Sequence, residues 1–159
     1  MTKVTIRTIL LYLSALLIFS GIESCKKSDP PAPKSKTTLL TQGSWKTVKE
    51  ETKTGTGAWI DVTGSIQACD KDNIFIFRTN TTFEENEGAT KCNPGDPQII
   101  GTGNWSFGNN ETQLNLTPTG FPPPFRIYSL DQLDESTLMV TYTYTIGGIT
   151  YYERSTVGH

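Results

Sequence analysis

The sequence predicts an all-β domain, an antiparallel up-and-down β-barrel of about eight strands. Residues 137–145, TLMVTYTYT, alternate with a period of two, which is typical of a strand with one apolar and one wetter face. Gly147-Gly148 then makes a tight turn into residues 149–156, ITYYERST, the strongest hairpin signal in the chain. Similar segments recur at spacings of about 8 to 12 residues, and no stretch after residue 39 carries a helical stripe.

The other strands are expected wherever β-branched and aromatic residues cluster between turn residues. In chain order these segments are residues 44–52, 59–62, 73–79, 81–87, 103–108, 112–117 and 125–130. The segment at 59–62 is either a separate short strand or an extension of the first hairpin. Asn109-Asn110 is expected to turn 103–108 into 112–117, because Asn adopts turn conformations readily.

Composition limits the function classes open to this chain. Its 159 residues leave room for one domain once the N-terminus is set aside. A net charge of −2 offers no basic surface, so we expect no nucleic-acid partner. We expect a monomer.

Residues 1–24 are predicted to be an export signal. Lys3 and Arg7 precede the short apolar run ILLYLSALLIF, the order found in secretory signal peptides. The run is short for a membrane span, which needs about 20 apolar residues, and it has no polar face that would make it an amphipathic helix.

Cys25 ends this segment in the context Ile22-Glu23-Ser24-Cys25, which resembles the lipoprotein box of bacterial lipoproteins of the Bacteroidetes type. The resemblance implies a lipidated Cys25, a membrane anchor and an outer-membrane location, either periplasmic or surface-exposed. Glu23 departs from the small residue usual in such a box. The alternative is that Cys25 simply ends a signal peptide. Residues 25–38, rich in Lys and Pro, are expected to be an extended tether before a domain at 39–159.

The domain also resembles the lipocalins. GSWK at 43–46 matches their Gly-x-Trp motif on the first strand, GNWS at 103–106 repeats it, and Arg154 lies on the last strand. Together with the lipoprotein box, these features are similar to the small lipocalin-like domains of Bacteroidetes lipoproteins. The resemblance implies that Gly43 and Trp45 close one barrel end, with Arg154 packed across the tryptophan. The chain is shorter than larger lipocalins and lacks their C-terminal helix, which argues against a roomy cavity.

Cys69 and Cys92 remain once Cys25 is set aside from the three cysteines. In an exported domain we expect them to form a disulfide. An immunoglobulin-like sandwich would place a Trp between them in sequence, and there is none. They are too few to bind a metal, because the lone His159 is terminal, and they lack the C-x-x-C spacing of a redox site.

No set of residues predicts catalysis. His159 is expected at a frayed end, which makes it a poor general base. DKDN at 70–73 begins like a calcium loop but lacks its later ligands and glycine, and EENE at 84–87 is typical of a charged strand end. We therefore expect no enzyme, metal or cofactor.

Aromatic residues on alternating strand faces are the candidates for ligand binding. An eight-stranded barrel is just wide enough for packed side chains or one small ligand, so these rings are either core or binding site. The set is Phe75, Phe77, Phe83, Phe107, Tyr142, Tyr144 and Tyr151. The loop TGFPPPF at 119–125 is either a lid or partner-binding edge, or a stiff crossing between strands.

Two functions remain open. The first is an anchored, lipocalin-like protein that binds a small apolar or amphipathic molecule in the barrel. The second is a cell-envelope interaction module with a solid barrel, whose loops contact protein or glycan. Interior volume separates them, since ligand sites exceed about 300 Å³.

Overall fold

The computed structural model describes residues 32–123 and 125–159. The predicted signal segment at 1–24, Cys25 and tether residues 26–31 lie outside these residues. One compact unit runs from Lys34 to His159. The described part of the chain contains no helix that is both long and apolar enough to cross a membrane.

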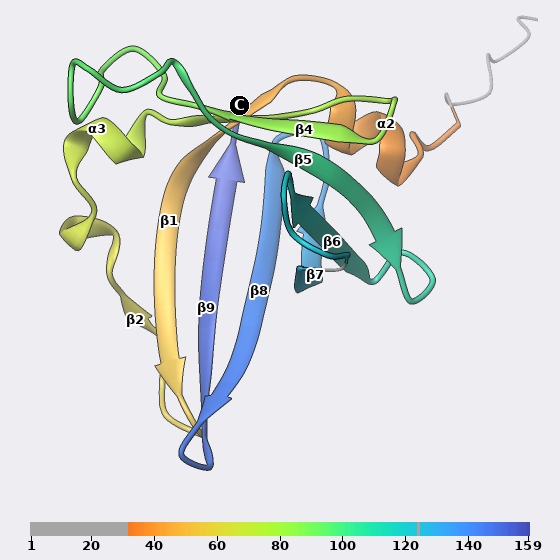
Figure 1. Ribbon diagram of the computed structural model, residues 1–159. Helices are drawn as coiled ribbons and strands as arrows, with labels where there is room; N and C mark the ends of the chain where they lie inside the picture. Colours follow the sequence, from red (N-terminus) through yellow and green to blue (C-terminus); the bar gives the residue numbers. More distant parts are fainter. Residues whose placement is uncertain (1–31, 124) are drawn as a thin grey trace, which may run out of the picture. The chain divides into compact units, whose positions relative to one another are not determined.

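The expected barrel is present. The strands of the described residues are β1 (Ser44–Thr54), β2 (Ile60–Asp61), β3 (Ile74–Phe77), β4 (Thr82–Asn86), β5 (Ile99–Gly108), β6 (Gln113–Pro118), β7 (Arg126–Leu133), β8 (Thr137–Ile146) and β9 (Ile149–Gly158). Every neighbouring pair from β3 to β9 is antiparallel, and β9 returns to pair with β1 (Figure 1). Eight strands thus close the barrel, while β2 is a short addition beside β1.

One edge of β1 pairs with β9, and the opposite edge pairs with two different strands. β3 pairs with Ser44–Lys46, and β2 pairs further along with Glu51 and Thr52. Between these two pairings the backbone of Glu50 is bonded instead to the loop after β2, through Val62 N and the Thr63 hydroxyl. This stretch of the wall therefore has no strand neighbour on that side.

The turns predicted between strands are confirmed. Gly147 and Gly148 both have positive φ, as the tight hairpin between β8 and β9 requires. Asn109, Asn110 and Glu111 form a left-handed run between β5 and β6. Strand β5 begins four residues earlier than expected, at Ile99.

Short helical segments accompany the strands in the part of the chain that the structure describes. They are α2 (Lys36–Thr41), the 3₁₀ helix η1 (Thr63–Ser65) and α3 (Ala68–Lys71). Ser35 caps α2 by accepting a hydrogen bond from Thr38 N. Residues 36–38, expected within the extended tether, therefore form the start of a helix. A helix this short escapes detection because it spans less than two turns.

Helix α2 leads into the closed end of the barrel. Leu40 and Trp45 are completely buried there, and the Trp45 indole N–H donates to the Leu40 carbonyl at 2.9 Å. His159 covers the indole, with ring centroids 4.0 Å apart, and its Nδ1 donates to the Ser44 carbonyl. The expectation of a frayed His159 is wrong, because these contacts fix it to β1.

The predicted partner of Trp45 is also corrected. Arg154 does not pack across Trp45. It pairs in register with Glu51, six residues along β1, and its guanidinium lies 3.8 Å from the ring of Trp59. Arg154 lies too far from the end of β9 to contact Trp45, because only the last residues of β9 pair with the part of β1 that contains Trp45. Gly43 lies at the closed end, as expected. A side chain at this position would crowd the His159 ring, because a Cβ would lie 3.0 Å from it.

Substituting Trp45 tests the closed end. Trp45→Ala should lower the free energy of unfolding by about 3–5 kcal/mol, since it removes a wholly buried ring and its hydrogen bond. Trp59→Ala is the matched control, because Trp59 is only half-buried, and about 1 kcal/mol is expected. Denaturant titration followed by circular dichroism measures both. A loss below 1 kcal/mol for Trp45→Ala would contradict this account of the closed end.

Candidate functional site

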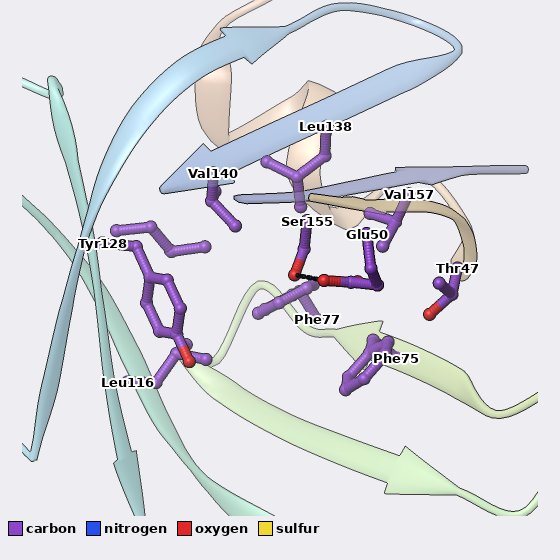
Figure 2. A pocket seen from close by; sticks show the side chains of 11 residues that line it. Thr47, Glu50, Phe75, Phe77, Leu116, Tyr128, Leu138, Val140, Ser155 and Val157 are labelled. Carbon is purple, nitrogen blue, oxygen red and sulfur yellow. Dashed lines mark hydrogen bonds between the residues drawn. The ribbon is translucent and has the colours of Figure 1, made fainter. Parts of the chain in front are cut away.

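The barrel interior contains a small apolar cavity of about 120 Å³. Figure 2 shows side chains from opposite walls pointing into it. We call this space the inner cavity. Its lining residues are Thr47, Glu50, Phe75, Phe77, Leu114, Leu116, Tyr128, Leu138, Val140, Ser155 and Val157.

A second, more polar space of about 290 Å³ adjoins the inner cavity. We call it the outer chamber. Its lining residues are Glu50, Glu51, Thr52, Val62, Ile66, Arg126, Tyr128, Tyr142, Glu153 and Ser155. Glu50, Tyr128 and Ser155 line both spaces, and we call the position of these three shared residues the neck. The lining of the outer chamber contains more charged side chains than that of the inner cavity.

A bulge in β1 places Glu50 at the neck. Strict alternation from the buried Trp45 would put Lys49 and Glu51 inside, but the register with β9 shifts between Thr47 and Lys49. After the shift Glu50 faces the cavity, where the Ser155 hydroxyl donates to its carboxylate at 2.8 Å. Glu51 instead accepts hydrogen bonds from Lys49 at 2.7 Å and from Arg154 at 3.1 Å.

Tyrosines continue along the wall beyond the neck. Tyr128 lies 5.7 Å from Tyr142, Tyr142 lies 5.7 Å from Tyr144, and Tyr144 stacks on Tyr151 at 5.4 Å. Arg126 lies over Tyr142, with 5.2 Å between the guanidinium carbon and the ring centroid. The Tyr144 hydroxyl donates to Glu153 at 3.0 Å. This row of rings carries the polar wall from the neck toward the β8–β9 turn.

The structure divides the predicted aromatic candidates into three groups. Phe75 and Phe77 line the inner cavity, and Tyr142 lines the outer chamber. Tyr144 and Tyr151 extend the tyrosine row without lining either space. The other two, Phe83 and Phe107, pack in the core, where Phe107 meets Trp105 edge-on at 5.4 Å.

The main residues missed from the sequence are Glu50, Tyr128, Arg126 and Ser155. Tyr128 and Leu130 face the interior from alternate positions of β7, so the alternation in the segment FRIYSL was sufficient to predict that Tyr128 points inward. Arg126 lies in the same phase of β7, but a charged residue adds nothing to an apolar alternation pattern. Glu50 carried no signal, because a bulge leaves no mark in the sequence of the strand that contains it.

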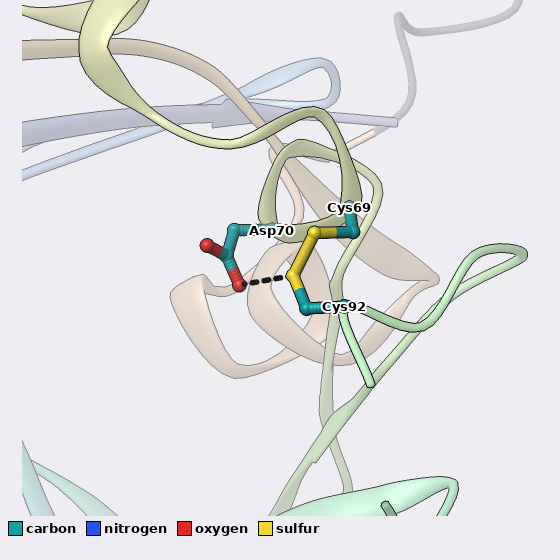
Figure 3. A group of neighbouring side chains, drawn as sticks. All are labelled: Cys69, Asp70 and Cys92. Carbon is teal, nitrogen blue, oxygen red and sulfur yellow. Dashed lines mark hydrogen bonds between the residues drawn. A yellow bond between two sulfur atoms is a disulfide. The ribbon is translucent and has the colours of Figure 1, made fainter. Parts of the chain in front are cut away.

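The predicted disulfide is present between Cys69 in α3 and Cys92 in the β4–β5 connection, with 5.1 Å between the Cα atoms. Asp70 Oδ1 lies 3.3 Å from the Cys92 sulfur (Figure 3). A disulfide sulfur carries no hydrogen, so this contact is not a hydrogen bond. Although Cys69, Asp70 and Cys92 group closely enough to suggest metal ligands, the bridge leaves neither sulfur as the thiolate that a metal requires.

Asp72, from the calcium-like DKDN segment, has a structural role. Its Oδ2 accepts hydrogen bonds from Ala89 N, Thr90 N and the Thr90 hydroxyl. The bond from the Thr90 side chain is the main cause that lowers the pKa of Asp72. The carboxylate thus fastens the connection that carries Cys92.

Removing the disulfide should destabilise the domain. Cys69→Ala/Cys92→Ala is expected to lower the free energy of unfolding by about 3.5 kcal/mol, because the bridge closes a loop of about 24 residues in the unfolded chain. Denaturant titration of the variant measures the loss. The wild type under strong reductant is the control and should reproduce it. Identical unfolding midpoints with and without reductant would contradict a stabilising bridge.

Glu50 and Glu51 should affect stability with opposite signs. Burial is the main cause that raises the pKa of Glu50 above 4.5 and Glu153 adds to it, although the Ser155 hydrogen bond opposes the shift. The folded state therefore holds this proton to higher pH than the unfolded state, and stability falls as pH rises through that window. The hydrogen bond from Lys49 chiefly lowers the pKa of Glu51, so its contribution is present at neutral pH and is lost on acidification.

Glu50→Gln should consequently raise the thermal midpoint at pH 7 and give little gain at pH 4. Glu51→Gln, its neighbour and matched control, should lower the midpoint at pH 7 and lose this effect at low pH. Thermal unfolding of both variants across pH 3.5–8 provides the measurement. Parallel pH profiles for the two variants would exclude opposite environments for these carboxylates.

Comparisons with known proteins add structural likeness only. No protein-family model and no curated protein matches the sequence. Among solved structures, the chain is similar to a lipocalin-like protein from Bacteroides uniformis ATCC 8492, with 14% identity, a TM-score of 0.40, and 73% of this chain and 97% of that chain covered. It is also similar to a DUF4847 family protein from Bacteroides vulgatus ATCC 8482, with 14% identity, a TM-score of 0.44, and 76% and 96% covered. The closed antiparallel barrel itself rests on the pairing of β1 with β9.

Proposed function

We propose that this protein is a non-catalytic, membrane-anchored binding protein that holds one small amphipathic molecule in its barrel and acts as a monomer. The observation that carries the proposal is the adjacent pair of spaces, an apolar inner cavity and a more polar outer chamber, whose linings share the three residues of the neck. Such a gradient from apolar to polar lining suits a ligand with two chemically different ends.

The volume of the inner cavity narrows the proposal. At about 120 Å³ it is smaller than the roughly 300 Å³ expected of a complete ligand site. An apolar cavity of roughly 150 Å³ holds one benzene molecule, so about five heavy atoms fit here. A larger ligand must extend through the neck into the outer chamber, which favours an amphipathic molecule over a wholly apolar one.

Native mass spectrometry of residues 26–159, purified from the original host, tests ligand binding. The wild type should carry a small-molecule adduct. Val140→Phe fills the inner cavity and should reduce adduct occupancy to about a tenth or less, because overpacked cavities exclude ligands. Val48→Phe is the control, since Val48 is 61% exposed and does not line the cavity. A bare wild-type polypeptide would contradict the proposal.

The second candidate is the interaction module, and one observation favours it. The rings of Phe121 and Phe125 in the TGFPPPF loop contact each other at a tilt, with centroids 4.3 Å apart, yet both are substantially exposed. Such rings are common anchors at protein interfaces. A bare wild-type polypeptide in the experiment above would favour this candidate, since its barrel needs no ligand.

The membrane anchor is supported by the sequence around Cys25 alone. Two or three acyl chains at this residue would hold the protein stably on a bilayer, since each buried CH₂ contributes about 0.8 kcal/mol. Cells grown with labelled palmitate should label the wild type and should not label Cys25→Ala. Cys69→Ala/Cys92→Ala is the control and should label like the wild type. Equal labelling of Cys25→Ala would exclude this anchor.

A further inference from the structure

The neck of the site holds a carboxylate without a cationic partner. Glu50 is partly buried, and the Ser155 hydroxyl satisfies one of its oxygens. Within the described ranges, no Lys, Arg or His nitrogen lies within 4.0 Å of this carboxylate. Withdrawing a carboxylate from water without a counter-charge is unfavourable, so the neck favours a ligand that supplies a cation or a hydrogen-bond donor.

The charges around the neck point the same way. Glu51 also borders the outer chamber but is already paired with Lys49 and Arg154. The groups that remain are the carboxylates of Glu50 and Glu153 and the guanidinium of Arg126. Glu153 and Arg126 oppose each other in charge, so the carboxylate that remains without an opposite charge at the neck is that of Glu50.

Arg126 is placed less well to bind the head group of a ligand seated in the inner cavity. It lines the outer chamber but not the inner cavity, is exposed, lies over the ring of Tyr142, and donates to the Tyr128 hydroxyl at 3.4 Å. If the anionic head of a ligand bound to Arg126, its apolar end would have to extend past the carboxylate of Glu50 to reach the inner cavity. If the anionic head lay at the neck, it would be repelled by the same carboxylate. The arrangement therefore disfavours fatty-acid-like ligands.

Tyr128 adds an aromatic surface at the neck. Its side chain borders both spaces, and the ring of Tyr142 follows it at 5.7 Å. The negative face of a phenol ring attracts ammonium groups. A carboxylate and aromatic rings that surround one opening are the two features that stabilise an organic ammonium ion.

We propose that the bound molecule is a protonated amine with a short apolar body. The body occupies the inner cavity, and the ammonium group sits at the neck, donating to Glu50 beside the ring of Tyr128. This inference rests on the proposed function and narrows its ligand to one chemical class. The cavity volume limits the enclosed part to about five heavy atoms, the size of a pentyl or small aryl group.

Three probes of equal chain length test the inference, namely n-pentylamine, n-pentanol and pentanoate. Isothermal titration of residues 26–159, which include the whole compact unit, is performed at pH 7. The amine should bind at least about tenfold more tightly than the alcohol, and the alcohol more tightly than the carboxylate, because only the amine supplies the missing charge.

Substitution at the neck assigns the charge effect to one residue. Glu50→Gln keeps the size of the side chain and should weaken amine binding about tenfold or more, while alcohol affinity changes less than about twofold. Glu135→Gln is the control and should leave amine affinity within about twofold, because the Glu135 side chain is 72% exposed and lines neither space. Near-UV circular dichroism establishes that both variants are folded.

The outcomes separate the inference from the function on which it rests. Pentanoate binding as tightly as the amine would overturn the amine assignment and transfer the head-group role to Arg126, while the amphipathic site would stand. Unchanged amine affinity in Glu50→Gln, or equal affinity for all three probes, would also overturn the assignment. If none of the probes binds and the protein from the host carries no adduct, both the inference and the proposed function fail.

Discussion

The pairing of β1 with β9 is the contact on which the other features of this domain depend. It joins the first barrel strand to the last and removes the open sheet edges that would otherwise invite pairing with another chain. Closure also encloses the inner faces of the strands, so that a cavity forms between them. The bulge within this same pairing turns Glu50 inward and Glu51 outward, which gives the two neighbouring carboxylates different chemistry.

The two ends of the barrel differ in how completely their polar groups are satisfied. At the closed end, the N–H of Trp45 and a ring nitrogen of His159 each donate to a backbone carbonyl, and packed rings exclude water. At the neck, Glu50 receives a single neutral hydrogen bond. In proteins generally, the first kind of environment stabilises the fold, and the second is typical of functional sites.

Much of the fold could be predicted from the sequence, because alternation and turn residues depend on local chemistry. The strand at 137–145, the Gly147-Gly148 turn and the buried Trp45 are examples. Contacts across the barrel could not be predicted in the same way. Arg154 lies over Trp59 and His159 over Trp45 because the β1–β9 register places them there, and register is a property of two strands together. The candidate site was only partly predictable for the same reason, since Phe75 and Phe77 follow strict alternation whereas Glu50 depends on a bulge.

The barrel wall has a gap in its strand pairing along β1, between the residues that pair with β3 and those that pair with β2. Along this short stretch, next to the neck, the Glu50 backbone is held by Val62 N and a Thr63 hydroxyl, and no strand ladder runs beside it. Local opening requires least free energy where few backbone hydrogen bonds must break together. In this stretch, β1 is held on one side by the strand ladder with β9 and on the other side by two contacts from the loop after β2, so local opening there would leave the β1–β9 pairing intact.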